Sequence, residues 1–191
     1  MATSTRRAIC WTPIWNRDRE GVGLEHLLLH ERSADSAILT FDEACQPFRL
    51  AYQLTWDERW RLRAARLAVT TEHGVRPLHL DADGEGHWRD GAGRALTDLE
   101  GCIDIDIWPT PFTNTFPIRR QPMAVGATRE FLMAYVVAPE LTVVAMRQRY
   151  TRLADQRYLY ESLDGSGFSA EISVDEEGLV LDYQDTFRRV R

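Results

Sequence analysis

Cysteine is scarce in this chain, and long apolar runs are absent. The three cysteines, Cys10, Cys45 and Cys102, are widely spaced and form no C-x-x-C pair. That spacing argues against a disulfide framework or a zinc site and predicts free thiols in a reducing compartment. No window approaches the roughly 18 apolar residues of a membrane span, and the N-terminal MATSTRRAICW lacks the apolar core of a signal peptide. We therefore expect a soluble, cytoplasmic protein with no stable membrane insertion.

Positive charge is not in excess either. The chain has 23 basic residues, all of them arginine, against 29 acidic ones, which gives a net charge of -6 and a pI near 5.4. Nucleic acids and anionic membranes require a basic footprint, so no nucleic-acid partner is expected. Arginine suits planar, bidentate pairing with carboxylates or anionic ligands, although its heavy use can equally reflect the composition of a genome.

Familiar catalytic and cofactor motifs are missing as well. The chain has no G-x-S-x-G, no P-loop and no dinucleotide-binding glycine motif. The stretch DADGEG at 81–86 partly resembles a calcium loop, but Ala92 stands where that loop needs its glutamate, so we interpret it as a hairpin turn. His26 and His30 would lie more than about ten ångströms apart on a strand. We therefore predict no metal and no cofactor.

Period-two alternation is what the sequence does have. With 191 residues, of which 44% are hydrophobic and 27% charged, the chain has the balance of one domain spanning 1–191. Strands at about ten-residue spacing, joined by short turns, predict a mainly β fold: a curved antiparallel sheet or open half-barrel meander with one or two short helices. The expected strands are 8–15, 23–32, 37–41, 48–56, 60–71 (with a slip at Ala64–Ala65), a hairpin over 75–91, and then 130–141, 141–153, 157–163, 168–174 and 179–187.

The most unusual segment is CIDIDIWPTPFTNTFPIRR, from Cys102 to Arg120. In its initial strand, alternate residues share a face, so three isoleucines would point one way and Asp104 and Asp106 the other. Solvent-facing aspartates would need no partners. On the concave face of a curved sheet they would need compensation, and Arg119 and Arg120 follow within reach. The sequence leaves open whether this group is a ligand pocket or a structural ion network.

The same segment predicts a short helix. Thr113 or Asn114 could cap it, and Gln121–Pro122 would end it. The hydroxyl and amide groups of Thr113, Asn114 and Thr115 lie between prolines, an arrangement that suits a polyhydroxylated head group and equally suits a capped turn.

Two further residues are candidates on their own chemistry. Glu25 shares a strand face with leucines, which suggests a buried partner such as an arginine or a ligand hydroxyl, with an exposed edge position as the alternative. Trp88 is a candidate platform for a sugar, because indole faces stack on sugar C–H surfaces, with core packing as the alternative.

The run from Cys102 to Arg120 resembles the signature of a bacterial glycolipid-binding protein family, formerly a domain of unknown function. The similarity extends along nearly the whole chain, through GVGLEH around Glu25, YQLTWDERW at 52–60, DGEGHWRDG around Trp88, QRYTRL at 148–153 and FSAEISVDEEGLVLDY at 168–183. The resemblance implies an open β half-barrel wrapped on helix, similar in shape to bacterial lipoprotein-localisation carriers. It also implies that Gln148 and Tyr150 add an amide and a phenol to the pocket. Trp108 departs from the expected pattern and would narrow that pocket.

These observations lead to a functional expectation with one alternative activity, and with a third possibility of a scaffold that holds no small ligand and has its concave face plugged by side chains. We expect a non-enzymatic protein that binds an amphiphilic ligand, a glycolipid or related polar-headed lipid, in the concave face of the sheet. Asp104, Asp106, Asn114 and the arginine pair would meet the head group. The alternative is a glycoside hydrolase that uses Asp104 and Asp106 as paired carboxylates, since their separation along a strand is near the roughly 6.5–9.5 Å of inverting enzymes. The sequence indicates no oligomeric state.

Overall fold

The alternating segments form fourteen strands of one sheet in the computed structural model, which describes residues 6–14, 23–42 and 44–191. The strands are β1 (Arg7–Pro13), β2 (Leu24–Leu29), β3 (Ser33–Phe41), β4 (Pro47–Trp56), β5 (Leu62–Thr71), β6 (Gly74–Ala82), β7 (Trp88–Asp90), β8 (Asp104–Trp108), β9 (Thr128–Val137), β10 (Thr142–Ala154), β11 (Arg157–Ser162), β12 (Ser169–Val174), β13 (Val180–Tyr183) and β14 (Phe187–Arg189). The last residue of the expected strand 8–15, residues 1–5 of the N-terminal stretch, and the first two residues of GVGLEH lie outside the described residues.

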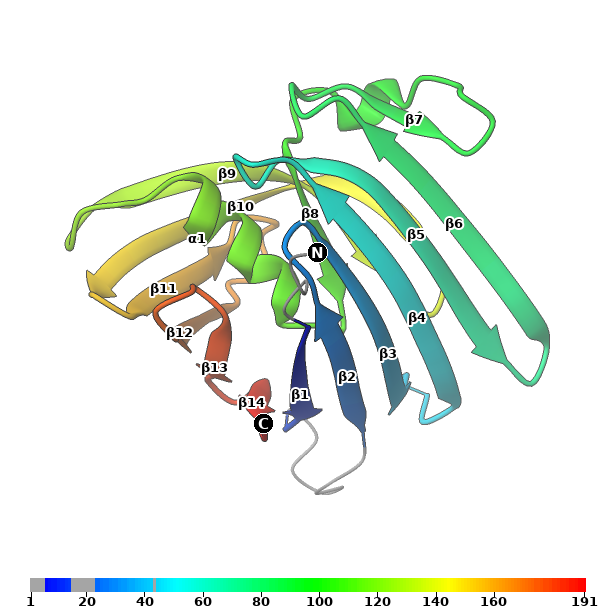
Figure 1. Cartoon of the computed structure of the whole chain (residues 1–191), viewed down its shortest axis with the longest axis horizontal. Helices are drawn as coiled ribbons and strands as arrows, with labels where there is room; N and C mark the ends of the chain where they lie inside the picture. Colours follow the sequence, from blue (N-terminus) through cyan, green and yellow to red (C-terminus); the bar gives the residue numbers. More distant parts are fainter. Residues whose placement is uncertain (1–5, 15–22, 43) are drawn as a thin grey trace, which may run out of the picture.

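The strand order is β7-β6-β5-β4-β3-β2-β1-β14-β13-β12-β11-β10-β9-β8. Strands β1 and β14, from the two ends of the chain, pair side by side in the middle of the sheet. Within the described residues, β7 and β8 are the two edges and do not pair with each other. The predicted open, curved, mainly antiparallel sheet is therefore confirmed (Figure 1).

One pair of strands departs from the meander. β8 runs parallel to β9, with Asp104 opposite Met133 and Trp108 opposite Val137. Parallel neighbours need a crossover connection of a dozen or more residues, usually containing a helix. Residues 109–127 supply it, with a 3-10 turn η3 (Phe112–Asn114) and the helix α1 (Thr115–Arg120). The short helix predicted from the sequence is therefore present.

The stretch from β8 through α1, which we call the inner segment (residues 104–120), lies inside the curve of the sheet. Figure 1 shows α1 between β9–β13 on one side and β1–β6 on the other. Both faces of β8 are covered as a result: Ile105 and Asp104, which point in opposite directions, are each 0% exposed. The isoleucine and aspartate faces of β8 therefore look toward two different halves of the sheet.

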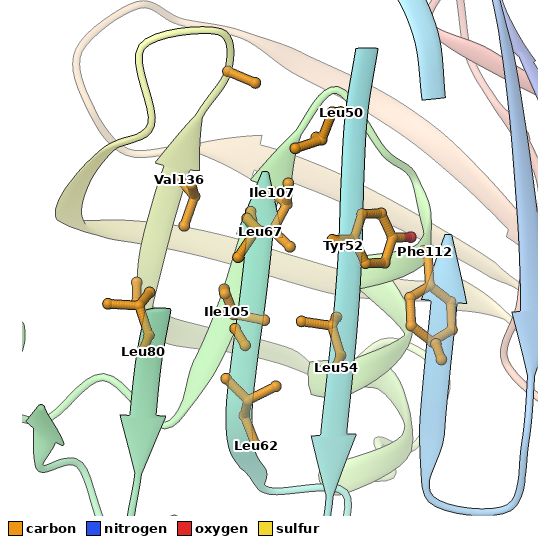
Figure 2. Packing of buried hydrophobic residues seen from close by; sticks show 14 of the residues in the cluster. Leu50, Tyr52, Leu54, Leu62, Leu67, Leu80, Ile105, Ile107, Phe112 and Val136 are labelled. Carbon is orange, nitrogen blue, oxygen red and sulfur yellow. The ribbon is translucent and has the colours of Figure 1, made fainter. Parts of the chain in front are cut away.

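The isoleucine face packs into the larger core. Ile105 and Ile107 lie against leucines of β4 and β5, as Figure 2 shows for Leu54, Leu62 and Leu67. Phe112 and Phe116 of the inner segment belong to the same cluster, where Trp56 contacts both rings at centroid distances of 6.0 and 5.4 Å. We call this half of the interior the filled side.

The opposite half is built from β9–β14 and is rich in tyrosine. Its buried cluster contains Tyr150, Tyr158, Tyr160 and Tyr183, with Ile118 of α1 packed among them. We call this half the hollow side, because a cavity of about 1080 Å³ opens there.

Two local predictions can be compared directly with the backbone. For the slip expected at Ala64–Ala65, which a bulge or a short helical turn could explain, the structure has a β-bulge one residue earlier: Thr55 pairs with Ala64 and its neighbour Trp56 pairs with Leu62, which leaves Arg63 as the extra residue. The hairpin over 75–91 is β6 and β7, and the Asp83 carboxylate accepts hydrogen bonds from two backbone N–H groups of its turn. Gly86 has a φ of +101°, and a Cβ there would lie 2.9 Å from the Cα of Gly101, so only glycine fits.

Candidate functional site

The hollow side contains a cavity of about 1080 Å³. The inner segment forms one wall, through Asp106, Trp108, Thr110 and Asn114, and strands β9–β14 form the other. The turns between β3 and β4, β9 and β10, β11 and β12, and β13 and β14 surround it at one end. Ligand pockets are typically about 300–1,000 Å³, so this cavity is large enough for a drug-sized ligand.

Aromatic rings line much of the cavity: Phe41, Phe48, Trp108, Tyr135, Tyr160, Phe168, Tyr183 and Phe187. Several of them form a continuous series of edge and tilted contacts. Tyr160 lies 5.8 Å from Tyr183, Tyr183 lies 6.1 Å from Phe187, and Phe187 lies 5.7 Å from Trp108, all between ring centroids. Rings at these distances stabilise one another and present a rigid apolar surface.

Phe41 and Phe168 are the exposed members of this aromatic wall, at 37% and 44% of their surface. Each lies where a strand gives way to a turn, and both line the cavity. Large apolar side chains left in contact with water beside a cavity are a common feature of sites that receive an apolar group.

The main polar group in the cavity is the carboxylate of Asp106. It accepts hydrogen bonds from Gln148 Nε2 at 2.5 Å and from Thr113 Oγ1 at 2.8 Å, both neutral donors. Thr113 Oγ1 in turn accepts the backbone N–H of Ile107, which ties the η3 turn to β8. Burial raises the pKa of Asp106, and the hydrogen bonds from Gln148 and Thr113 oppose that rise.

The negative charge of Asp106 affects the pKa values of the tyrosines around it. Burial raises the pKa of Tyr135 to about 12, and the negative charges of Asp106 and Asp164 add to that effect. Burial and Asp106 also raise the pKa values of Tyr150 and Tyr160. These phenols therefore remain neutral hydrogen-bond donors near neutral pH.

Asn114 and Tyr150 form a second polar contact behind the cavity. The phenol of Tyr150 donates to Asn114 Oδ1 at 2.8 Å, and Asn114 Nδ2 donates to the carbonyl of Pro111 at 3.1 Å. Asn114 precedes α1, but its side chain makes no capping hydrogen bond to the helix backbone. The predicted cap is therefore wrong for Asn114, whose amide is used by Tyr150 and Pro111 instead.

Asp104 has a different environment from Asp106. It is fully buried and forms a two-oxygen ion pair with Arg120, at 2.9 Å from Nε and 2.6 Å from Nη2. Burial raises the pKa of Asp104, and Arg120 opposes that rise. The guanidinium of Arg120 also lies 5.5 Å from the ring centroid of Phe131. Asp104 is not among the residues that line the large cavity.

Arg119 does not join the aspartates. Its Nη1 donates to the carbonyl of Glu177 at 2.9 Å, and its guanidinium lies 5.1 Å from the ring centroid of Trp60. Consecutive residues of a helix point about 100° apart, so adjacent arginines are directed to different surroundings. The two arginines therefore do not act as a pair, contrary to the arrangement expected from the sequence.

Glu25 is buried, and its partners are hydroxyl groups. It accepts hydrogen bonds from Ser36 at 2.8 Å, Tyr52 at 2.5 Å and Thr110 at 2.7 Å. Burial raises the pKa of Glu25 to about 7, against the lowering effect of these bonds. Thr110 lines the cavity and also accepts the N–H of Phe112, so Glu25 holds the turn that follows β8 from the filled side.

The two other candidates lie in the interior without lining the cavity. Trp88 is 2% exposed and donates its indole N–H to the carbonyl of Cys102 at 2.7 Å. Thr115 is fully buried, and its hydroxyl has no hydrogen-bond partner among the described residues.

Sequence reasoning missed most of the aromatic wall. Tyr135, Tyr160 and Tyr183 come from three different strands and Phe168 directly precedes a fourth, and no spacing in the sequence relates them to Asp106. The available signal was the aromatic content of the last strands, such as YLY at 158–160, where alternation places Tyr158 and Tyr160 on one face. Trp108 lines the cavity, as its position in the motif suggested.

Metal and membrane features can be assessed for the part of the chain that the structure describes. In it, no three histidine, cysteine, aspartate or glutamate side chains gather as a metal site. No helix there has the length and apolar character needed to cross a membrane.

This chain is similar to known proteins in both sequence and structure. The family model described as "Putative glycolipid-binding" matches residues 12–189. The chain belongs to this family. A crystal structure of a DUF1089 family protein from Pseudomonas aeruginosa is also similar, with 50% sequence identity over 90% of this chain and 94% of that one, and a TM-score of 0.87. No curated protein matches the chain. Membership of the glycolipid-binding family confirms the resemblance carried by the Cys102–Arg120 motif.

Proposed function

We propose that the protein binds one amphiphilic molecule, a glycolipid or related polar-headed lipid, inside the cavity of the hollow side. The observation that carries this proposal is the combination of about 1080 Å³ of space with an aromatic wall and one inward-facing carboxylate. The rings of Tyr160, Tyr183 and Phe187 would cover the apolar part of the ligand. Asp106 and Thr110 would meet its hydroxyl groups. The name of the family supports the same class of ligand.

The geometry supports binding more than hydrolysis. An inverting glycosidase needs two carboxyl groups on opposite sides of one scissile bond. Asp106 lines the cavity, but Asp104 is 0% exposed and both of its oxygens are held by Arg120. We therefore propose a carrier or sensor of the ligand. The thiols of Cys10 and Cys102, neither of which is in a disulfide bond, fit a cytoplasmic setting.

A blocked cavity tests the proposal. Ala170 lies on β12, is 5% exposed and lines the cavity, so Ala170→Phe would place a ring where the ligand is expected. The matched control is Ala37→Phe, which adds the same ring on the exposed face of β3. Binding of n-octyl-β-glucoside, measured by calorimetry, should be lost in Ala170→Phe and retained in Ala37→Phe, with melting temperatures recorded for both variants.

Native mass spectrometry supplies the complementary test. Protein isolated from its own cells should carry an adduct with the mass of a single amphiphile, and Ala170→Phe should lack it. Equal binding of the glucoside by both alanine variants would show that the cavity is not the site and would overturn the proposal.

A further inference from the structure

The side chains that line the cavity have charge of one sign. Among the described lining residues there are five acids, Asp42, Asp106, Glu140, Asp164 and Asp185, and no arginine or histidine. The whole chain has 23 basic residues against 29 acidic ones, so a cavity lined without regard to charge would include several arginines. The cavity therefore has a negative potential that the overall net charge of -6 does not by itself explain.

Three arginines of the described residues are held by groups other than the carboxylates of the cavity. Arg120 is committed to Asp104, and Arg119 to the carbonyl of Glu177 and the ring of Trp60. Arg76 reaches the rim from outside, where its Nη1 donates to the backbone carbonyl of Glu140 at 3.2 Å. None of these guanidinium groups belongs to a residue that lines the cavity.

Among the acids that line the cavity, Asp106 is the one that belongs to the inner segment. Its two hydrogen-bond donors, Gln148 and Thr113, are neutral, so no cation compensates its charge inside the protein. A carboxylate can accept about four hydrogen bonds, which leaves Asp106 with capacity for a ligand. The rings of Tyr160 and Tyr183 line the same space, and the faces of such rings attract cations.

We infer that the cavity selects amphiphiles with a cationic head group, such as an amino sugar or another ammonium, and rejects anionic ones. This inference rests on the proposed function and specifies the ligand class of the same site. An ammonium group beside Asp106 would pair with a partly buried carboxylate whose two side-chain donors are neutral, and would lie against aromatic faces. A phosphate, sulfate or carboxylate would add a like charge beside Asp106, and the described residues that line the cavity include no arginine to pair with it.

Three probes with the same chain test the selectivity: n-octyltrimethylammonium, n-octyl-β-glucoside and n-octyl sulfate, each below its micelle-forming concentration. Calorimetry on the wild-type protein should give the tightest binding for the ammonium probe and the weakest for the sulfate, with at least about a tenfold difference between them. Added salt should weaken binding of the ammonium probe and leave the neutral glucoside unaffected.

Substitution of Asp106 tests whether the preference for the cationic probe depends on this carboxylate. Asp106→Asn should weaken binding of the ammonium probe at least about tenfold and binding of the glucoside by a clearly smaller factor, because asparagine keeps one oxygen that can accept a hydrogen bond from a sugar hydroxyl. The control, Asp98→Asn, changes the net charge by the same amount at an exposed position of η2 (Thr97–Leu99) outside the cavity, and it should alter neither affinity.

The outcomes separate the two proposals. Equal affinity for the charged probes, a preference for the sulfate, or equal losses of all three probes in Asp106→Asn would overturn the cationic selectivity while leaving a lipid-binding cavity intact. Binding of none of the three probes would contradict the proposed function itself. The ranking of probes on the wild-type protein does not depend on how well any variant folds.

Discussion

The two sides of the inner segment differ in how their space is used: one is a packed core and the other contains a cavity. On the filled side, Ile105 packs against leucines of β4 and β5 in the larger core and lines no part of the cavity (Figure 2). On the hollow side, the other face of the same strand carries Asp106 and looks into about 1080 Å³ of open space. One five-residue strand, β8, thus has a structural face and a candidate binding face.

Glu25 and Asp106, one carboxylate from each side, show the difference between the two sides most directly. Glu25, on the filled side, accepts three hydroxyl hydrogen bonds and lines no part of the cavity. Asp106, on the hollow side, accepts two side-chain hydrogen bonds and faces the cavity. Burial raises the pKa of both groups. The difference between them is that Glu25 is surrounded by the protein, whereas Asp106 has acceptor capacity left for a ligand.

The largest effect is expected where the inner segment is anchored. Asp104→Ala removes one partner of a buried ion pair and leaves Arg120, whose side chain is 14% exposed, without its carboxylate. Such changes cost about 3–5 kcal/mol of unfolding free energy. Denaturant unfolding should show this loss, whereas Arg119→Ala, at an exposed neighbour, should cost less than about 1 kcal/mol.

Asp104→Ala also decides between the two interpretations that the sequence left open. If the variant keeps nearly its full stability but loses ligand binding, Asp104 belongs to a binding site, and the separation of β8 into two functional faces is wrong. Loss of stability with retained binding in the folded fraction is the result that the ion pair predicts.

The next largest change in unfolding free energy is expected from removing a packed side chain, and its size should differ between the two sides. Ile105→Ala leaves a cavity in the filled side and should cost about 2–5 kcal/mol. Phe168→Ala removes a larger side chain from the hollow side, but Phe168 is 44% exposed at the cavity, so its loss should cost less than about 1 kcal/mol. Chemical denaturation measures both. Equal costs would mean that the aromatic wall is packed like a core and is not kept open.

Glu25, on the filled side, should make the unfolding free energy of the protein depend on pH. Its pKa is about 7 in the folded protein and 4.5 as a free side chain, so the folded state binds the proton more tightly. The stability that protonation confers is fully present below about pH 4.5 and is lost as the pH rises through about 7. The total loss is on the order of 3 kcal/mol.

The variant Glu25→Gln isolates this term because glutamine cannot ionise. Its unfolding free energy should match that of the wild type near pH 4.5 and exceed it progressively toward pH 8, with Glu176→Gln as the exposed control. A difference between wild type and variant that stays constant over this range would show that Glu25 titrates normally and that its burial has no such consequence.

Much of the fold could be predicted because its signals are local. Alternation predicts the strands, Asp83 and its glycines predict the hairpin turn, and the prolines around 111–122 predict a short helix. The pairing of Asp104 with Arg120 was also within reach, since both lie on one compact segment.

The remaining features depend on contacts between residues distant in the sequence. Alternation in IDIDI predicts a strand with one buried face, but a strand inside the curve of the sheet is buried on both. The sequence could not show that β8 joins β9 in parallel, because that placement depends on the whole crossover 109–127. It could not show the direction of Arg119, since a rotation of about 100° along a short helix decides it.

The smallest expected effect on stability belongs to the residue that matters most for the proposed ligand. Asp106→Asn keeps the shape of the side chain and removes a partly buried charge, and a flipped Gln148 amide can donate or accept a hydrogen bond as required. At pH 7 we expect a change of less than about 1 kcal/mol in unfolding free energy.

Because burial raises the pKa of Asp106 in the folded state, wild-type stability declines as the pH rises through that pKa, and the asparagine variant avoids the decline. The difference in favour of the variant should therefore grow with pH in denaturant titrations. A destabilisation as large as that of Asp104→Ala would instead mean that both aspartates hold the fold together, and that the hollow side differs from the filled side in volume alone.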